Sequence, residues 1–177
     1  MVEIVSLAAA RRQLRLESTD TSRDADLGDF IDDAAAWVER YTGHILAERE
    51  VTEHHVLRGA AQLGAWPIFD VGSIAVTVQG LDDLPVPVAA RLSAVRRPAV
   101  LLPPVSLGAW PYCSVTAEVT VTVTAGYQTE DQVPRNFRRA MLLLITAYDE
   151  DREGGALFQA AEASAKNLCR FARKRGL

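Results

Sequence analysis

The sequence predicts an α+β fold, in which an antiparallel β region is inserted into a small helical bundle. Near both ends of the chain, apolar residues recur at steps of three and four, which is typical of amphipathic helices. Between residues 49 and 126 the pattern changes to short β-branched segments separated by glycine and proline. No helical pattern separates these segments, which argues against a doubly wound parallel sheet.

The composition is that of an ordinary globular protein. The chain has 177 residues, 49% of them hydrophobic, and a net charge of −4, which argues against a general nucleic-acid binder. We find no signal-peptide pattern and no apolar run that could span a bilayer, so we expect a soluble protein with no membrane contact. We expect one domain, with N-terminal helices over 1–48, a β insertion over 49–126 and C-terminal helices over 134–177.

Two helices are expected before the β region. Ser6 can cap a short helix that runs through Leu14. A second helix is predicted from about Asp24 to Thr42, and Gly43 follows it where a left-handed residue commonly ends a helix. The apolar stripe of this second helix consists of Leu27, Phe30, Ile31, Ala34, Val38 and Tyr41.

The clearest strand lies in the sequence SVTAEVTVTVTAGY, which begins at Ser114. Valine and alanine alternate there with threonine, serine and glutamate, so one face should be buried and the other solvated. The prolines of the β region, Pro85 and Pro87 among them, suit edge strands and loops of a small antiparallel sheet.

Two further helices are expected at the C-terminal end. Pro134 stands at the first turn of the earlier one, where its missing N–H group costs nothing. Its apolar face consists of Phe137, Ala140, Met141, Leu144, Ile145 and Tyr148. The last helix is predicted from about Leu157 to Lys174, and its apolar side consists of Phe158, Ala161, Ala165, Leu168, Phe171 and Ala172.

No constellation of residues indicates chemistry. His54 and His55 are neighbours on a predicted strand, so their side chains point to opposite faces and are poorly placed to share a metal ion. Ser73 lacks the pattern of a nucleophile elbow, and the acidic pairs near Asp82 and Asp149 are typical of solvated turns and helix ends. Cys113 and Cys169 lack metal-ligand spacing. We expect no catalytic residue, no metal ion and no cofactor.

Charge is unevenly distributed along the chain. The start of the second helix is acidic, and the end of the last helix is basic. The helix dipole explains part of this pattern, and the remainder indicates contact between unlike surfaces or, for the basic tail, contact with DNA phosphates. The acidic face consists of Asp24, Asp26, Asp29, Asp32 and Asp33.

Two blocks of sequence resemble the head–tail connector family of tailed bacteriophages, also called adaptor or head-completion proteins and found in gene transfer agents. The first block, residues 6–46, contains Leu14-Arg15, an acidic helix start and Tyr41-Thr42-Gly43. The second, residues 121–153, contains a valine-rich strand, Ala125-Gly126-Tyr127, a proline and a leucine-rich helix that ends in charge.

The resemblance implies a structural protein without catalytic activity. Such proteins form a ring, usually of twelve copies, below the portal protein of a virion or phage-like particle assembled in the bacterial host cytoplasm. The ring extends the channel through which double-stranded DNA passes, and it offers a docking surface to stopper or tail-terminator proteins. The alternatives are another neck or tail-completion protein and a small DNA-binding packaging protein.

The last helix is the expected docking element. If it hinges at Gly154-Gly155, it can leave its own bundle and bind the portal or a neighbouring copy. Leu168 and Phe171 would be the apolar anchors of this interface. Its polar rim would consist of Arg170, Arg173, Lys174 and Arg175. The alternative is that the last helix closes the core of its own chain.

Overall fold

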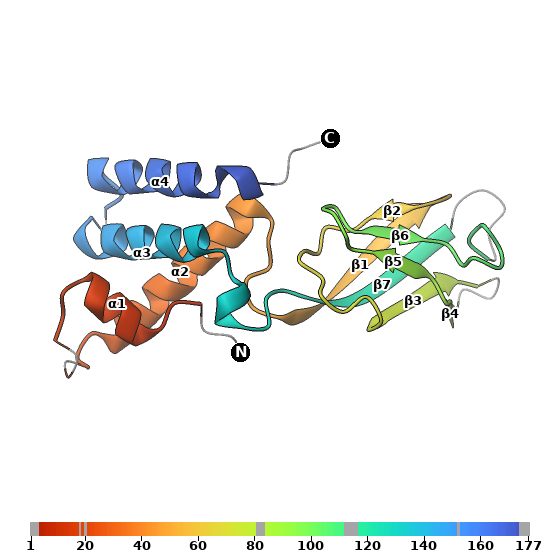
Figure 1. Ribbon diagram of the computed structural model, residues 1–177, viewed down its shortest axis with the longest axis horizontal. Coiled ribbons are helices and arrows are strands. Elements are labelled where there is room, and N and C mark those ends of the chain that lie inside the picture. Colours follow the sequence, from red (N-terminus) through yellow and green to blue (C-terminus); the bar gives the residue numbers. More distant parts are fainter. Residues whose placement is uncertain are drawn as a thin grey trace. The chain divides into compact units, whose positions relative to one another are not determined.

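The computed structural model describes residues 4–17, 19, 21–80, 84–111, 117–151 and 153–173. The chain divides into two compact units (Figure 1). The helical unit comprises Met1–Ala47 and Tyr127–Leu177, and the β unit comprises Glu48–Gly126. The predicted α+β class is confirmed, because every described helix belongs to the first unit and every described strand to the second. None of the described helices has the length and hydropathy that a membrane crossing requires.

The helical unit is arranged around α3, which contacts α1, α2 and α4 (Figure 1). Its α-helices are α1 (Leu7–Gln13), α2 (Asp24–Thr42), α3 (Arg135–Glu150) and α4 (Ala156–Cys169). Its described residues also form the short 3₁₀-helices η1 (Glu130–Gln132) and η2 (Arg170–Ala172).

The ends of the first two helices lie where the sequence predicts them. The Ser6 hydroxyl accepts a hydrogen bond from the Ala9 amide at 3.2 Å and so caps α1. Gly43 ends α2 with φ 66°, a left-handed conformation that glycine adopts without strain. Pro134 directly precedes α3, as expected for a residue that has no N–H group to donate.

One apolar core holds the helical unit together. Val38, Met141, Leu144 and Ile145 are fully buried in it, and Phe30 and Ile31 pack against it while partly exposed, which confirms the two predicted stripes. Trp37 also belongs to this core, although the predicted stripe of α2 omitted it. Ala165 and Cys169 bring α4 into the same cluster, and burial raises the pKa of the Cys169 thiol to about 11.

The predicted extent of the last helix is wrong. The α-helix ends at Cys169 instead of Lys174, and η2 follows with about three residues per turn instead of 3.6. Phe171 is 84% exposed, whereas the neighbouring Ala172 packs against the core, so Phe171 does not belong to the buried side on which the sequence places it. Lys174 and Arg175 lie outside the described residues.

The connection between α3 and α4 is anchored by the side chain of Asp151. One carboxylate oxygen accepts a hydrogen bond from the Gly155 amide at 3.0 Å, and the other accepts one from the Phe158 amide at 3.1 Å. These amides lie at the first turn of α4, where no helical carbonyl can accept from them. Gly154 makes the turn with φ 73°. The hydrogen bonds from Gly155 and then Phe158 lower the pKa of the Asp151 carboxyl below its ordinary 3.8.

Replacing Asp151 by alanine is expected to lower the Tm at neutral pH, because the amides of α4 lose their acceptor. The folded-state pKa is the lower one, so the carboxylate stabilises the fold fully above its ordinary pKa. This contribution is lost as the pH falls through the lowered value. Thermal unfolding between pH 7 and pH 2.5 or so should show the two proteins converging in acid. Glu150→Ala, at an exposed neighbouring residue, is the control. If Asp151→Ala lowered the Tm by the same amount at every pH, the capping role would be contradicted.

The described part of the β unit forms two antiparallel sheets, whereas the sequence predicts one. The four-stranded sheet has the order β1-β7-β3-β4, and the three-stranded sheet has the order β2-β6-β5. The first sheet consists of β1 (Arg49–Leu57), β7 (Ala117–Ala125), β3 (Ile74–Gln79) and β4 (Pro85–Pro87). The second consists of β2 (Ala61–Gln62), β6 (Val100–Leu102) and β5 (Arg91–Ser93). The segments that contain β5 and β6 are expected as strands, but strands of two or three residues are too short to show by alternation that they form a sheet of their own.

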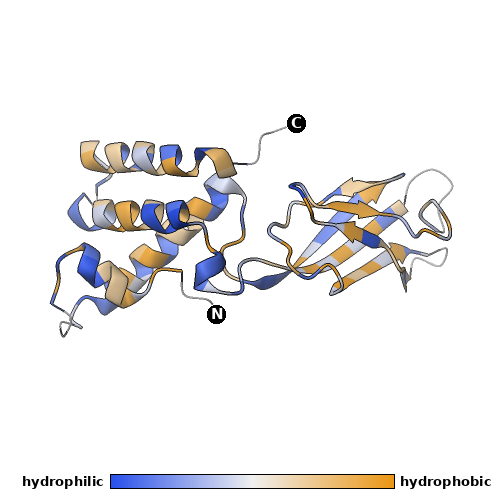
Figure 2. Ribbon diagram, in the orientation of Figure 1, coloured by the Kyte–Doolittle hydropathy of each residue, from blue (hydrophilic) through white to orange (hydrophobic). Residues whose placement is uncertain are grey.

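Strand β7 has the predicted two-residue alternation (Figure 2). Val119, Val121 and Val123 are buried, while the threonines between them are only partly so. Ser114 and Val115, which the sequence assigns to the same strand, lie outside the described residues. Pro85 and Pro87 lie in β4 at the edge of the sheet, as predicted. Proline has no backbone N–H to donate to a neighbouring strand, so it suits an edge position.

Candidate interaction surface

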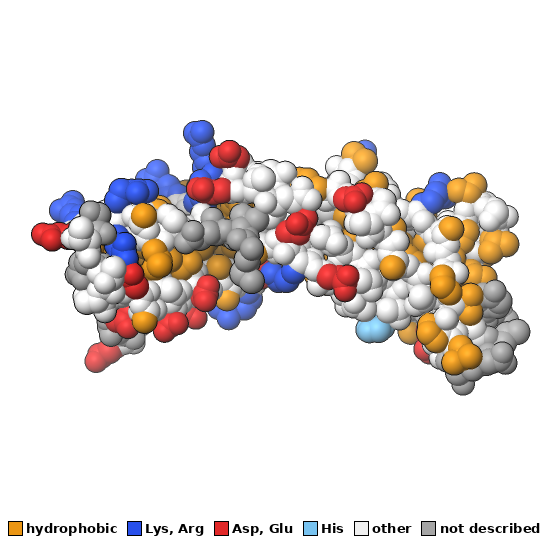
Figure 3. Space-filling view, turned by 90° about the horizontal axis from the view of Figure 1, so that it is seen from below, with side chains coloured by type: hydrophobic (Ala, Val, Ile, Leu, Met, Phe, Trp, Pro, Cys, Tyr) orange, Lys and Arg blue, Asp and Glu red, His pale blue; other side chains and the backbone are white. Residues whose placement is uncertain are grey.

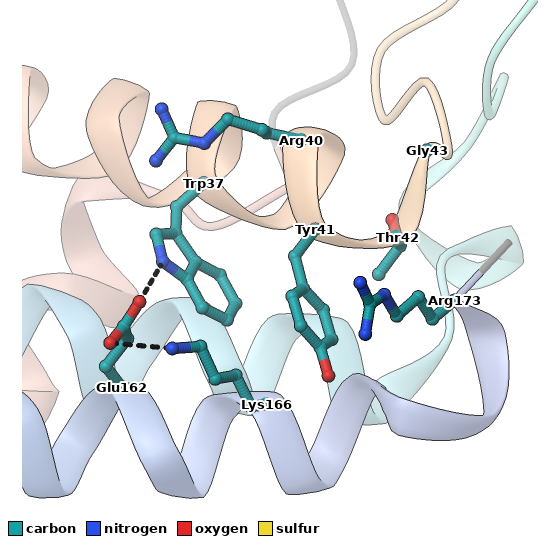
Figure 4. A pocket seen from close by; sticks show the side chains of 8 residues that line it. All are labelled: Trp37, Arg40, Tyr41, Thr42, Gly43, Glu162, Lys166 and Arg173. Carbon is teal, nitrogen blue, oxygen red and sulfur yellow. Dashed lines mark hydrogen bonds and ion pairs between the residues drawn. The ribbon is translucent and has the colours of Figure 1, made fainter. Parts of the chain in front are cut away.

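A groove of about 450 Å³ lies where the C-terminal ends of α2 and α4 meet in the helical unit (Figure 4). We call it the C-terminal groove. It is lined by Trp37, Arg40, Tyr41, Thr42, Gly43, Glu162, Lys166 and Arg173. The groove thus offers mainly aromatic rings and charged groups, and neither histidine nor cysteine is among its lining residues.

Two aromatic rings of α2 lie against this groove. Trp37 and Tyr41 are four residues apart on one helix, so they share a face, and their rings stack with centroids 5.2 Å apart and an interplanar angle of 12°. The Trp37 indole N–H donates a hydrogen bond to the Glu162 carboxylate at 3.3 Å. This bond joins α2 to α4 and holds the Trp37 ring in place (Figure 4).

The groove is predominantly cationic. Lys166 lies 2.9 Å from Glu162, one turn away on α4, and its hydrogen bond is the main cause of the lowered pKa of the Glu162 carboxyl. The Arg173 guanidinium lies 5.3 Å from the centroid of the Tyr41 ring, within the range of a cation–π contact. With Arg40, the lining contains three cations and one carboxylate. The surface therefore suits an acidic partner.

The residues predicted to anchor a docking tail have different surroundings. Leu168 packs against the core of its own unit, and its carbonyl accepts a hydrogen bond from the Asn136 amide group at 2.7 Å. The exposed Phe171 ring lies under the Arg170 guanidinium, 4.9 Å from it. Phe171 and Arg170 are thus available to a partner, whereas Leu168 already contributes to the fold.

The predicted acidic face also divides into two groups. Asp24 forms an ion pair with Arg11 of α1, so it has a partner within its own unit. Asp29, Asp32 and Asp33 are exposed, and within the described part of the chain none of the three has a hydrogen bond or an ion pair. They are spaced i, i+3 and i+4 on α2 and therefore form one surface cluster, which we call the acidic patch. Asp26 is exposed as well.

The remaining polar residues singled out in the sequence are not gathered into a site. His54 lies 3.0 Å from the Thr120 hydroxyl, and His55 lies 3.1 Å from the Glu53 carboxylate. Asp149 forms an ion pair with Arg23. The described residues hold no group of three or more histidine, cysteine or acidic side chains that could bind a metal ion. Asp82, Asp83 and Cys113 lie outside the described residues.

Sequence reasoning missed the C-terminal groove. Its signals were two pairs of residues at i, i+4 spacing, Trp37 with Tyr41 and Glu162 with Lys166. Each pair is common on amphipathic helices, and only the packing of α2 beside α4 makes them parts of one surface.

No family model and no curated protein matches the sequence. Solved structures do match the fold. A chain from the neck of the empty gene transfer agent (GTA) particle, computed with C6 symmetry, has a TM-score of 0.77. It is 22% identical, and the match covers 98% of this chain and 91% of that one. This chain has the same fold.

Two further matches come from native particles. A chain from the neck of the native GTA particle, computed with C12 symmetry, has a TM-score of 0.68, with 22% identity over 100% of this chain and 97% of that one. A chain from the virion of the native particle has a TM-score of 0.64, also with 22% identity, over 100% of this chain and 94% of that one. The similarity thus extends over both units.

Proposed function

We propose that the protein is a structural neck component of a phage-like particle, and that it acts there as the head–tail connector, or adaptor, below the portal. The observation that carries this proposal is the match of the whole chain, at a TM-score of 0.77, to a chain from the neck of a GTA particle. The sequence resemblance to connector proteins supports the same role independently, because it rests on motifs at both ends of the chain.

In this role the protein assembles into a closed ring of identical copies. The C6 and C12 symmetries of the two neck structures are consistent with a ring of twelve. The ring surrounds the path of double-stranded DNA and presents surfaces to the portal on one side and to a stopper or tail-terminator protein on the other. Such work requires stable surfaces and no catalysis, so we propose that the protein is not an enzyme and uses no cofactor.

We assign portal binding to η2, the exposed segment that follows α4. Phe171 is 84% exposed and stacked with Arg170, and aromatic residues with arginine are the side chains that most often dominate an interface. Lys174 and Arg175 follow in the sequence and extend the basic character of this segment. Leu168 supports the segment from inside the core instead of anchoring it in the partner.

A second candidate is a small DNA-binding protein of the packaging machinery. The observation that favours it is a second groove, distinct from the C-terminal groove, whose lining includes Arg12, Arg135, Arg138 and Arg139 together with Glu130 and Asp131. The net charge of −4 and the exposed acidic patch oppose it, because both repel phosphates.

Mixing the purified protein with the portal tests the proposal. Negative-stain electron microscopy should show a ring of copies seated on the portal. Phe171→Ser should abolish this binding without changing the Tm, because the Phe171 side chain lies outside the core. Leu157→Ser is the matched control, since Leu157 is also an exposed apolar residue of the helical unit, at 47%. Salt-sensitive binding to double-stranded DNA without binding to the portal would instead favour the second candidate.

A further inference from the structure

We propose that the C-terminal groove of one copy binds the acidic patch of the next copy, so that the contact that builds the ring runs from α2 to α2. This inference rests on the proposed function, in that it names the partner of the groove as a second copy of this chain. It does not depend on which other neck protein the ring meets.

The first argument is charge complementarity within one unit. The groove has three cationic side chains and one carboxylate, and that carboxylate is already bound to Lys166 and Trp37. The acidic patch has three carboxylates and, within the described residues, no cation paired with them. Like charges at i, i+4 spacing repel each other, so the patch on an isolated copy is unfavourable until cations approach it. The groove of another copy supplies these cations.

The second argument is that the acidic patch cannot bind the C-terminal groove of its own copy. The patch and the groove both include α2, with Asp33 and Arg40 seven residues apart on this helix, a separation of about 10 Å along its axis. Because a rigid helix fixes that separation, the patch has no path into the groove of its own copy. A contact between two different surfaces of identical copies is heterologous, and such contacts close into rings when the rotation between copies permits.

The third argument is the composition of the groove. Trp37 is buried in the core of its own unit and holds the partly exposed Tyr41 ring that stacks on it, so Tyr41 offers an apolar contact with little entropy to lose, while Arg40 and Arg173 supply directional donors. Exposed ion pairs alone contribute little, so the apolar contact with Tyr41 is needed for an interface that persists at physiological salt. The acidic patch then determines which surface docks there and in which orientation.

Charge reversal tests the inference in the full-length protein. Self-association is measured by sedimentation equilibrium at low salt and at increasing concentration. Reversing the patch (Asp29→Lys with Asp33→Lys) or the groove (Arg40→Glu with Arg173→Glu) should weaken self-association about tenfold or more. A chain that carries all four substitutions should recover it, because every contact then pairs a basic patch with an acidic groove.

The matched control is Arg135→Glu with Arg139→Glu, which reverses two exposed arginines of the other groove and should leave self-association unchanged. Circular dichroism and Tm establish that each variant is folded. If the groove variant does not fold, the patch variant alone decides, because its residues are exposed on α2.

Three results would overturn the inference: a wild-type protein that stays monomeric at millimolar concentration and low salt, reversed variants that associate like the wild type, or a fourfold variant that is not rescued. Groove reversal that abolishes binding to double-stranded DNA while self-association persists would also overturn it, in favour of phosphate as the ligand. Failure here remains distinguishable from failure of the proposed function, because portal binding is measured separately with Phe171→Ser.

Discussion

Replacing Leu144 by alanine is expected to lower the free energy of unfolding by about 2–5 kcal/mol. Leu144 is fully buried in the cluster that α2, α3 and α4 share. The substitution therefore removes apolar contacts and leaves a cavity that the packed helices fill only in part. Chemical denaturation followed by circular dichroism measures the change.

Leu143→Ala is the matched control, because it makes the same chemical change one residue away. Leu143 is partly exposed and does not belong to the core cluster, so its cost should stay below about 1.5 kcal/mol. Equal effects at the two positions would mean that the apolar stripe of α3 does not face the core.

Replacing Val121 by aspartate is expected to destabilise the β unit by about 4 kcal/mol or more, since it places a carboxylate without a partner in an apolar interior. Val121 is fully buried on the central strand β7, opposite Glu53 of β1 and Val76 of β3. Hydrogen exchange followed by mass spectrometry should show lost protection in peptides of the β unit. Peptides of the helical unit should be affected less, because the core cluster of that unit contains only its own residues.

The control for this prediction is Thr122→Asp. Its side chain points to the other face of β7, where the Thr122 hydroxyl lies 3.0 Å from that of Thr52. Losing that hydrogen bond should cost about 1 kcal/mol. A sheet that tolerated aspartate equally at both positions would contradict the assignment of its buried face.

The elements that sequence predicts well are those whose ends are set locally. Ser6, Gly43 and Pro134 each act within one helical turn, through a cap, a left-handed residue or a missing N–H group. The helix ends that they set can therefore be predicted from the sequence. The alternation of β7 is equally local. Because of these features, the predicted bounds of the main strand and of most helices lie close to the observed ones.

The elements that were missed depend on contacts between distant residues. The predicted end of α4 is too late, because the apolar pattern continues to Ala172 while the backbone has already tightened at Arg170. The C-terminal groove joins Trp37 to Glu162, which are 125 residues apart, and no local pattern specifies that pair. The small second sheet also depends on long-range pairing, as between Ala61 and Leu101.

Cryo-electron microscopy of the intact particle, with a tag on this chain, tests the central claim most directly. The neck role predicts that the tag decorates a closed ring between the portal and the tail-side proteins, and that the density of each copy fits both the helical unit and the β unit. If the tagged chain were absent from the purified particle, or located in the capsid shell or the distal tail, the proposed role in the neck would be contradicted.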